Sequence, residues 1–458
     1  MLTAAASTTA ALASSAVGTA ASAGEAPAPS RPSTASTLPL VQARPADGLV
    51  DSVGVRTTMY RANSSLYGDV DLVLDALRAD NVGLGVRHIR EEIILPRTNA
   101  TMAANQRRAW QRLRAIGIDV TCLLGDPDNS DGTVAQFADY IRTSLGGNSG
   151  MVRAVENSNE PNAPDKAWNR ANPAGWVRLC RARQAQMASQ FRSSSDLDRI
   201  LLAGPSVSGG AGLLKYELLG DLSPNVDLGN FHYYVGNRQQ HVPGADMDAI
   251  MQGIAINAPR KPVYCTETGM HQGRGTAMAS FPERVAALYI PRLVLEHLYH
   301  GVSKAFIFEL LDDHPDPLFK DQEAHFGLLR YNTRQLEPKP AYRSLKRLLD
   351  LLRDPGAQFS PGQLAMEVTG APRDYRQLLF EKSNGRRYLC MWRAVRIWNE
   401  TMGSAVKAGP VNVTLNLAEP ARINVYRPAR KTPPDSAYTG VTSLTLGLGG
   451  GVKVLEIY

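Results

Sequence analysis

The chain has 458 residues, more than an average single domain, and its 43% hydrophobic content is enough for a buried core. Its 50 basic and 43 acidic residues are mixed along the chain without a run of five like charges, which argues against a nucleic-acid-binding protein. No stretch of about 18 apolar residues occurs, so we expect no membrane span.

Residues 1–47 are rich in Ala, Ser, Thr and Pro and contain almost no large apolar side chains. Such a segment cannot bury enough surface to offset its loss of conformational entropy, so we predict that it is disordered. Its triplet Ala21-Ser22-Ala23 is typical of an export-signal cleavage site, but a charged start and a Leu-rich centre are missing. We interpret the segment as a degenerate or truncated export signal with a linker, and we expect a secreted or periplasmic protein.

From residue 48 to 358, short apolar runs alternate with segments of helical periodicity, a pattern typical of parallel sheets. Eight such repeats in about 300 residues favour a (β/α)8 TIM barrel, although an open doubly wound sheet can also hold eight strands. The expected helices are 69–79, 105–116, 174–191, 282–299 and 340–352. The expected strands are 53–59, 86–91, 119–124, 152–156, 200–203, 228–234, 263–268 and 305–310.

Residues 359–458 change to alternation of apolar and polar side chains with turn signals and without helical periodicity. This pattern predicts a β-sandwich-like accessory domain. The expected strands are 377–381, 388–398, 411–417, 423–426, 443–448 and 452–457.

The four cysteines are Cys122, Cys180, Cys265 and Cys390. None forms a C-x-x-C pair or has the spacing of metal ligands, so we predict structural free thiols. We find no sequence sign of a cofactor or of a bound metal, and we expect neither.

Two expected barrel strands run into glutamates at their carboxyl ends, where the active site of such a barrel lies. The fourth strand continues into ENSNEPN, residues 156–162, and the seventh strand contains PVYCTETG, residues 262–269. Because side chains alternate along a strand, Glu267 shares a face with the apolar Val263 and Cys265. A carboxylate in such a position is costly unless it has a partner or a function.

At these positions the sequence resembles clan A of the glycoside hydrolases, whose catalytic glutamates lie on barrel strands four and seven. The resemblance covers residues 51 to about 350 and is closest in character to cellulase-like and family 39-like members. Four motifs carry it: Glu156, Asn159, Glu160 and Pro161 on strand four, Thr266, Glu267 and Gly269 on strand seven, His232 and Tyr234 on strand six, and Gly85 and Arg90 on strand two.

The resemblance implies a retaining glycoside hydrolase that cleaves O-glycosidic bonds of a poly- or oligosaccharide, with Glu160 as general acid/base and Glu267 as nucleophile. A nearby arginine, Arg90, is expected to keep Glu267 ionised, and Tyr234 to orient it. Asn159 is placed to bind the 2-hydroxyl group of the sugar.

Other residues are weaker candidates for sugar contacts. His232 is either a site residue or a hydrogen-bonded core histidine, and Trp168 and Phe308 could stack on a sugar ring. Many clan members end strand eight with a tryptophan, whose place Phe308 or Glu309 takes here. Glu156 is expected to be a supporting hydrogen-bond partner.

Three alternatives stay open at this stage. One is a carbohydrate-binding barrel without turnover, and another is a transglycosidase that uses the same site. The third is a metal-dependent hydrolase built on the polar cluster of Glu309, Asp312, Asp313 and His314 after strand eight, although the spacing follows no standard ligand pattern.

Overall fold

The computed structural model describes residues 38–61, 66–80, 82–170, 172, 174–209, 212–238, 240–274, 278–332, 335–356 and 358–458. Most of the predicted export signal, residues 1–37, therefore lies outside the described residues. Among the described residues, no helix has the length and apolar character needed to cross a membrane. All four cysteines are buried free thiols.

Eight parallel strands form one sheet in the order β7-β6-β5-β4-β3-β10-β9-β8. Two isolated parallel bridges, Ala203 to Leu228 and Val207 to Phe231, join the two ends of this order and close the sheet. The predicted (β/α)8 barrel is confirmed. Its strands are β3 (Val53–Arg56), β4 (His88–Glu92), β5 (Asp119–Leu123), β6 (Val152–Glu156), β7 (Leu201–Ala203), β8 (Gly229–Tyr234), β9 (Val263–Gly269) and β10 (Lys304–Ile307).

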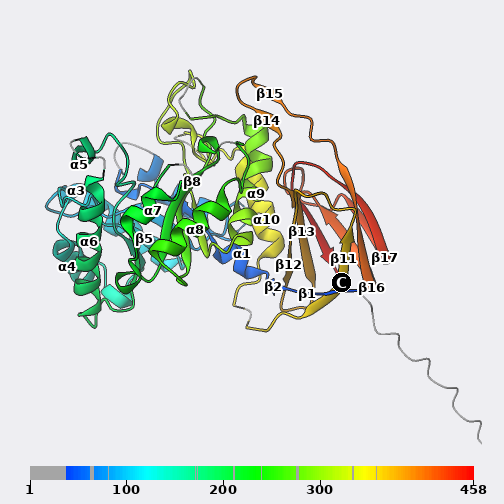
Figure 1. The fold of residues 1–458 in the computed structure, drawn as a ribbon, viewed down its shortest axis with the longest axis horizontal. Helices are drawn as coiled ribbons and strands as arrows, with labels where there is room; N and C mark the ends of the chain where they lie inside the picture. Colours follow the sequence, from blue (N-terminus) through cyan, green and yellow to red (C-terminus); the bar gives the residue numbers. More distant parts are fainter. Residues whose placement is uncertain are drawn as a thin grey trace, which may run out of the picture. The chain divides into compact units, whose positions relative to one another are not determined.

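Helices surround the barrel strands because each has one apolar stripe to bury (Figure 1). In the last helix, Tyr342, Leu345 and Leu349 are buried at a spacing of three and four residues, and Pro340 occupies the first turn. The helices are α1 (Asp47–Asp51), α2 (Val70–Leu77), α3 (Ala100–Ala115), α4 (Val134–Ser144), α5 (Ala167–Arg170), α6 (Gly175–Arg192), α7 (Leu214–Leu219), α8 (Met247–Asn257), α9 (Glu283–Tyr299) and α10 (Pro340–Leu352).

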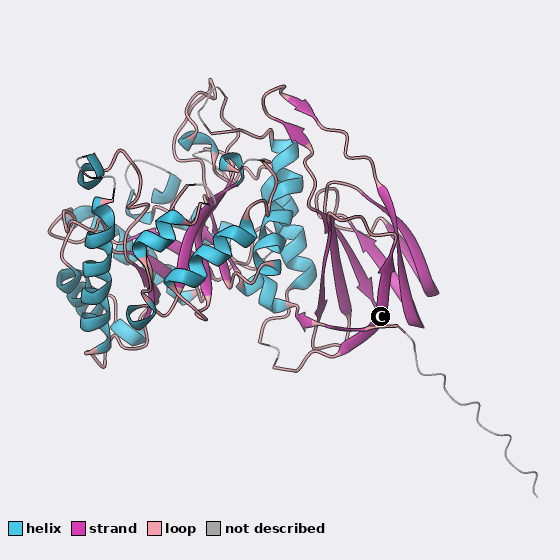
Figure 2. Cartoon of the chain, in the orientation of Figure 1, coloured by secondary structure: helices cyan, strands magenta, loops and turns pink. Residues whose placement is uncertain are grey.

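The C-terminal region is built of strands and loops (Figure 2), in agreement with the predicted accessory β-domain. Its longest strand, β16 (Val411–Tyr426), pairs with β11 (Gln363–Thr369) through its first half and with β18 (Lys453–Ile457) through its second half. The strands of this region enclose a separate apolar core. The strands that follow the barrel are β11 (Gln363–Thr369), β12 (Tyr375–Glu381), β13 (Arg387–Arg393), β14 (Trp398–Asn399), β15 (Ser404–Ala405), β16 (Val411–Tyr426), β17 (Ser436–Leu448) and β18 (Lys453–Ile457).

The prediction of disorder up to residue 47 is wrong for residues 38–47. Strand β1 (Leu40–Gln42) pairs with β11, and β2 (Arg44–Pro45) pairs with β12, so both belong to the sheet of the C-terminal domain. Ala43 between them is 4% exposed and lies in that domain's core. The partner strands lie more than 300 residues away in sequence, so local composition cannot reveal them. The proposed division at residues 358 and 359 stays a prediction.

Helix α9 lies between the barrel and the C-terminal domain, and residues on most of its circumference are buried. Trp392 Nε1 donates a hydrogen bond of 2.7 Å to Glu296 Oε1, and Arg292 Nη1 donates to the carbonyl oxygens of Val395 and Gly450. A helix that is buried all round needs packing partners on both sides. The C-terminal domain supplies one of them and the barrel supplies the other.

Candidate active site

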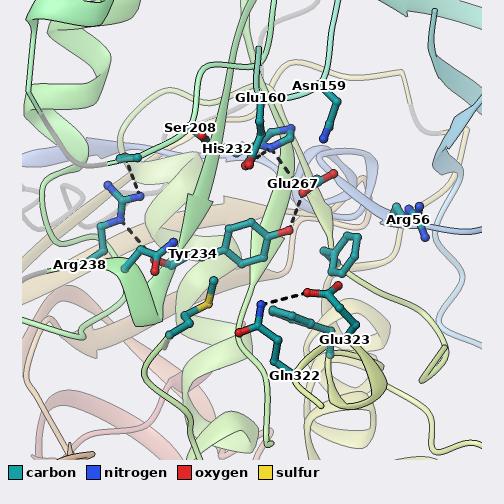
Figure 3. A pocket seen from close by; sticks show the side chains of 15 residues that line it. Arg56, Asn159, Glu160, Ser208, His232, Tyr234, Arg238, Glu267, Gln322 and Glu323 are labelled. Atoms are coloured by element: carbon teal, nitrogen blue, oxygen red, sulfur yellow. Dashed lines mark hydrogen bonds and ion pairs between the residues drawn. The ribbon is translucent and has the colours of Figure 1, made fainter. Parts of the chain in front are cut away.

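A pocket of about 460 Å³ lies at the carboxyl ends of the barrel strands (Figure 3). Glu267 lies near the end of β9, and Glu160 lies in the loop that follows β6. Both glutamates line the pocket together with residues from the loops after other strands. The remaining lining residues are Arg56, Asn159, Ser208, Gly209, His232, Tyr234, Asn237, Arg238, Met278, Phe308, Gln322, Glu323 and Phe326.

Glu267 is a buried carboxylate with a donor on each oxygen. Its Oε1 accepts a hydrogen bond of 2.5 Å from Arg90 Nη1, and its Oε2 accepts one of 2.6 Å from the Tyr234 hydroxyl. Burial by itself raises the pKa of Glu267, but the charges of His232 and Arg90 and the Tyr234 hydrogen bond outweigh it. The pKa falls from 4.5 to about 2, so Glu267 is ionised at neutral pH.

Arg90 is held in place by a second buried carboxylate. Its Nε donates a hydrogen bond of 2.6 Å to Glu156 Oε1, and its Nη2 donates one of 2.9 Å to Asn159 Oδ1. Glu156 is fully buried and also accepts a hydrogen bond of 2.9 Å from the Thr266 hydroxyl. Glu156 thus supports Arg90 below the pocket, the supporting position that the sequence predicts. Asn159 lines the pocket, and because its carbonyl oxygen is used by Arg90, its amide group is the end left for a ligand.

Glu160 has a different setting from Glu267. Its side chain is 29% exposed, against 10% for the side chain of Glu267. Its backbone has a φ of 42°, an uncommon value for a residue other than glycine. The hydrogen bond of 3.1 Å from its N–H to the Ser206 carbonyl helps to hold this conformation, which directs Glu160 into the pocket.

His232 lies between the two glutamates. Its Nδ1 is 2.8 Å from Glu160 Oε1 and 3.4 Å from Glu267 Oε2. A carboxylate oxygen of Glu160 lies within 4.8 Å of one of Glu267. Two carboxyl groups about 5–5.5 Å apart fit retaining glycoside hydrolysis, whereas inverting enzymes separate them by about 6.5–9.5 Å. The nearest oxygens of Glu160 and Glu267 are therefore closer together than the separation typical of inverting enzymes.

An aromatic group forms one side of the pocket. The ring of Phe308 packs edge-on against Tyr234 and Phe326, with ring centroids 6.1 and 5.1 Å away. The guanidinium of Arg56 lies over the Phe308 ring at 5.1 Å. Phe308 thus lines the pocket, and its predicted stacking on a sugar ring stays a prediction.

The structure does not bring two predicted substrate contacts, Trp168 and Glu309, to the lining of this pocket. The Trp168 indole donates a hydrogen bond of 2.9 Å to the Pro161 carbonyl, which ties the ring to the loop behind Glu160. Glu309 is 1% exposed and points to Arg56, with Nη1 at 3.3 Å from its Oε2. Burial raises the pKa of Glu309 to about 8, an effect that Arg56 offsets only in part.

Several pocket residues have no counterpart in the sequence prediction. Arg56 is the last residue of β3. A charged residue at the end of an apolar strand is the same signal that identifies Glu267, so the sequence could have indicated Arg56. Arg238, Gln322 and Glu323 lie in the connections that follow β8 and β10, and Glu323 begins a short 3-10 helix; periodicity gives no information about the path of the chain there. Their contribution to the pocket becomes visible only when the loops are folded.

The acidic residues after strand eight are each engaged by a cation or a histidine. Asp312 pairs with Lys339 at 2.7 Å, and Asp313 pairs with Arg61 at 2.7 Å. In the described part of the chain, the group with metal-ligand geometry is instead Glu160, His232 and Glu267. Both oxygens of Glu267 already accept hydrogen bonds, one of them from a guanidinium that repels cations, so these residues fit a metal ion poorly.

No protein-family model and no curated protein sequence matches this chain. Solved structures do match it. An endo-β1,6-glucanase superposes with a TM-score of 0.51 at 13% identity over 91% of this chain and 92% of that one. AbfB, a family 51 α-L-arabinofuranosidase from Bifidobacterium longum, superposes with a TM-score of 0.54 at 11% identity over 92% and 97%.

At such low identity the likeness shows the fold alone. It extends over the barrel and the C-terminal β-domain together, since more than nine-tenths of this chain is covered in both cases. The resemblance to clan A glycoside hydrolases that the sequence motifs indicate is therefore matched by the fold.

Proposed function

We propose that this protein is a retaining glycoside hydrolase that acts on a poly- or oligosaccharide. The observation that carries the proposal is the pair of carboxylates, Glu160 and Glu267, within 4.8 Å of each other in different surroundings. Glu267 is buried and has a pKa of about 2, whereas Glu160 is the more exposed of the two. The solved structures with the same fold carry names of glycosidases, which supports this class of reaction.

In the first step, an ionised Glu267 oxygen attacks the anomeric carbon and forms a glycosyl ester, while the bond to the leaving oxygen breaks. Glu160 donates its proton to that oxygen, so the leaving group departs as a neutral alcohol. In the second step, Glu160 removes a proton from water, and the resulting hydroxide attacks the same carbon. The ester breaks, Glu267 is released as a carboxylate, and the anomeric configuration of the substrate is retained.

The neighbouring residues support these steps. Arg90 and the Tyr234 hydroxyl fix the orientation of Glu267 and keep it ionised before attack. The amide of Asn159 is placed to donate to a sugar hydroxyl, a contact that strengthens in the transition state. His232 contacts both glutamates and holds them in register. The Ala/Ser-rich composition of residues 1–37 supports a secreted or periplasmic location.

The test begins with a panel of aryl glycosides and polysaccharides, because the sugar is to be identified. On the best substrate, NMR then follows the anomer that forms first. We expect the anomer of the substrate, and we expect a 2-deoxy-2-fluoro glycoside to label Glu267 in peptide mass spectrometry. Release of the inverted anomer would overturn the retaining mechanism, and release of glycosylated acceptors instead of free sugar would indicate a transglycosidase.

A further inference from the structure

One cation of the pocket wall, Arg56, has no part in the proposed mechanism. Arg56 is the last residue of β3, and its side chain is 17% exposed where it lines the pocket. Its Nη1 donates a hydrogen bond of 3.3 Å to Glu309 Oε2. Its Nε and Nη2 have no hydrogen-bond partner among the described residues, and neither atom is enclosed by protein. Two donors of this guanidinium therefore remain accessible at the pocket wall.

The guanidinium of Arg56 is held from several directions. It lies over the Phe308 ring, 5.1 Å from the ring centre. Glu309, which accepts its hydrogen bond, is 1% exposed. The Tyr67 hydroxyl donates a hydrogen bond of 3.4 Å to the same Glu309 oxygen. The N–H of Leu310 donates one of 3.2 Å to the Arg56 carbonyl, which joins the ends of β3 and β10. These contacts fix the position of the guanidinium before any ligand binds.

The pair of Arg56 and Glu309 leaves a positive charge at the wall. Burial raises the pKa of Glu309 to about 8, so its carboxyl group is mostly protonated at pH 7 and does not neutralise Arg56. No other carboxylate in the described part of the chain forms an ion pair with Arg56. A largely buried guanidinium without a counter-ion costs free energy, and a cation that is kept at such a cost indicates a function.

The position of Arg56 indicates which part of a substrate it meets. Arg56 lies on the Glu267 side of the pocket, away from Glu160 (Figure 3). It is close enough to Glu267 for the two charges to affect each other. In the proposed mechanism the leaving group lies beside Glu160, which protonates it. The attacked sugar therefore extends to the other side of the pocket, toward Arg56.

The surroundings of Arg56 favour a neutral oxygen atom over an anionic one. Glu267 is ionised, and Glu323, another residue of the pocket lining, is also close enough to feel the charge of Arg56. A carboxylate or sulfate group on the attacked sugar would have both of these acidic side chains beside it. A hydroxyl oxygen accepts a charge-assisted hydrogen bond from the guanidinium without that repulsion.

We infer that Arg56 binds the attacked sugar by donating from Nε or Nη2 to one of its hydroxyl oxygens, and that Glu309 is the positioning residue that holds Arg56 there. The inference rests on the proposed function and deepens it, because it assigns the part of the site that selects the attacked sugar. A guanidinium donates in a fixed planar geometry, so it binds a hydroxyl at one position of the ring and not at another. Arg56 is thus a specificity-determining residue.

The experiment compares the 4-nitrophenyl glycoside of the sugar that the panel identifies with analogues that each lack one hydroxyl group other than the 2-hydroxyl. The loss of kcat/KM for each missing hydroxyl is measured in the wild type, Arg56→Met, Glu309→Leu and Glu309→Gln. Arg153→Met is the matched control, because Arg153 is an exposed residue near the start of β6, at the opposite end of the barrel from the pocket.

In the wild type, one missing hydroxyl should lower kcat/KM by roughly 10- to 100-fold, the effect of a hydrogen bond to a charged group. That loss should nearly disappear in Arg56→Met, because the donor is gone, and persist in Arg153→Met. Glu309→Leu should also reduce it, since the guanidinium is no longer held. Glu309→Gln keeps an acceptor oxygen and should keep the loss. Replacing the nitrophenyl group by a second sugar should change kcat/KM by the same factor in the wild type and Arg56→Met.

Equal losses for every hydroxyl in the wild type and Arg56→Met would overturn the inference and leave the proposed function intact. A preference for a uronide that Arg56→Met abolishes would also overturn it, because Arg56 would then bind a carboxylate. Losses in Glu309→Leu that match the wild type would overturn the positioning role of Glu309. Should Arg56→Met fail to fold, the double variant Arg56→Met with Glu309→Leu decides, since it leaves neither buried partner alone.

If no glycoside is hydrolysed, the proposed function fails, and calorimetric titration with the methyl glycosides of common neutral sugars tests the sugar site alone. Weaker binding to Arg56→Met than to the wild type and Arg153→Met supports the inference. Equal binding to all three proteins, or no binding to any of them, overturns it.

Discussion

At the scale of single residues, the role of Glu267 can be tested with a variant that keeps the shape of its side chain. Glu267→Gln keeps the volume of the side chain and a hydrogen-bonding group, but the amide cannot form a glycosyl ester. We expect hydrolysis of the best substrate to fall by at least about 10⁴-fold, since a covalent route is removed and the remaining site only binds. Steady-state kinetics measures this, with Glu367→Gln on the exposed face of β11 as the matched control away from the pocket. Retention of more than a few per cent of activity would show that Glu267 is not the nucleophile.

Glu160 can be tested by the acidity of the leaving group. Glu160→Ala removes the proton donor, so hydrolysis of natural glycosides should slow by roughly 10²- to 10⁴-fold. A dinitrophenyl glycoside needs no such proton, so its glycosyl-enzyme should form almost normally and then accumulate. Azide, which needs no base, should restore turnover and give a glycosyl azide with the anomeric configuration of the substrate. Equal losses with both leaving groups and no effect of azide would make Glu160 a structural residue.

The pKa of Glu267 predicts how stability depends on pH. The folded-state pKa is depressed from 4.5 to about 2, so the unfolded chain binds this proton more readily than the folded chain. The resulting stabilisation, about 3 kcal/mol, is complete above about pH 5 and is lost as the pH falls through about 2. Urea unfolding of the wild type and Glu267→Gln should therefore differ by about 3 kcal/mol at pH 7 and by roughly half of that at pH 3. A difference that does not change with pH would contradict the ionised state of Glu267.

How far the sequence predicts the site depends on where each residue lies. Strand-end motifs correctly bring Asn159, Glu160, His232 and Glu267 to one pocket, because the carboxyl ends of all barrel strands meet there. Periodicity does not tell which way a residue beyond a strand turns, so Glu309 was assigned to the pocket although it faces Arg56.

At the scale of secondary-structure elements, the packing of α9 against β13 offers a sharp test. Trp392→Phe removes the N–H that donates to Glu296, a carboxylate that is only 1% exposed. A buried acceptor that loses its donor costs about 1–3 kcal/mol, so the melting temperature should fall while kcat at low temperature stays unchanged. Adding Glu296→Leu should restore part of the loss, because both polar partners are then gone. An unchanged melting temperature for the single variant would mean that the two elements are not coupled.

The elements differ in how readily the sequence reveals them. Strand β6 and helix α10 have the predicted bounds, since each has a clear apolar pattern and a clear stop. Helix α8 was missed, because Gly253 and several isoleucines weaken its helical propensity and packing of Ile250 and Ile254 holds it instead. Helix α4 was missed although its Thr133 and Gln136 form a capping box that the sequence displays.

At the scale of the whole molecule, the chain before the barrel completes the domain after it. A chain that starts at Leu38 keeps β1 and β2, whereas one that starts at Asp47 loses both strands and uncovers the edges of β11 and β12. We expect the shorter chain to melt roughly 1–2 °C lower, because a loss of about 1–2 kcal/mol in pairing and burial is divided by the large unfolding entropy of a chain of more than 400 residues. Calorimetry of the two chains and of the full chain measures this. Equal melting temperatures for the Leu38 and Asp47 chains would show that the two strands add nothing.

The burial of α9 on both sides has a consequence for anyone who recombines this protein with others. A chimera that replaces the C-terminal domain must also supply a replacement surface for α9, with acceptors for the Arg292 guanidinium and a donor for Glu296. A junction in the loop after α10 would keep α9 with the barrel. The groups that contact α9 from the C-terminal domain would then come from the other protein. Grafts should therefore exchange the whole C-terminal domain together with α9 and with β1 and β2, which belong to its sheet.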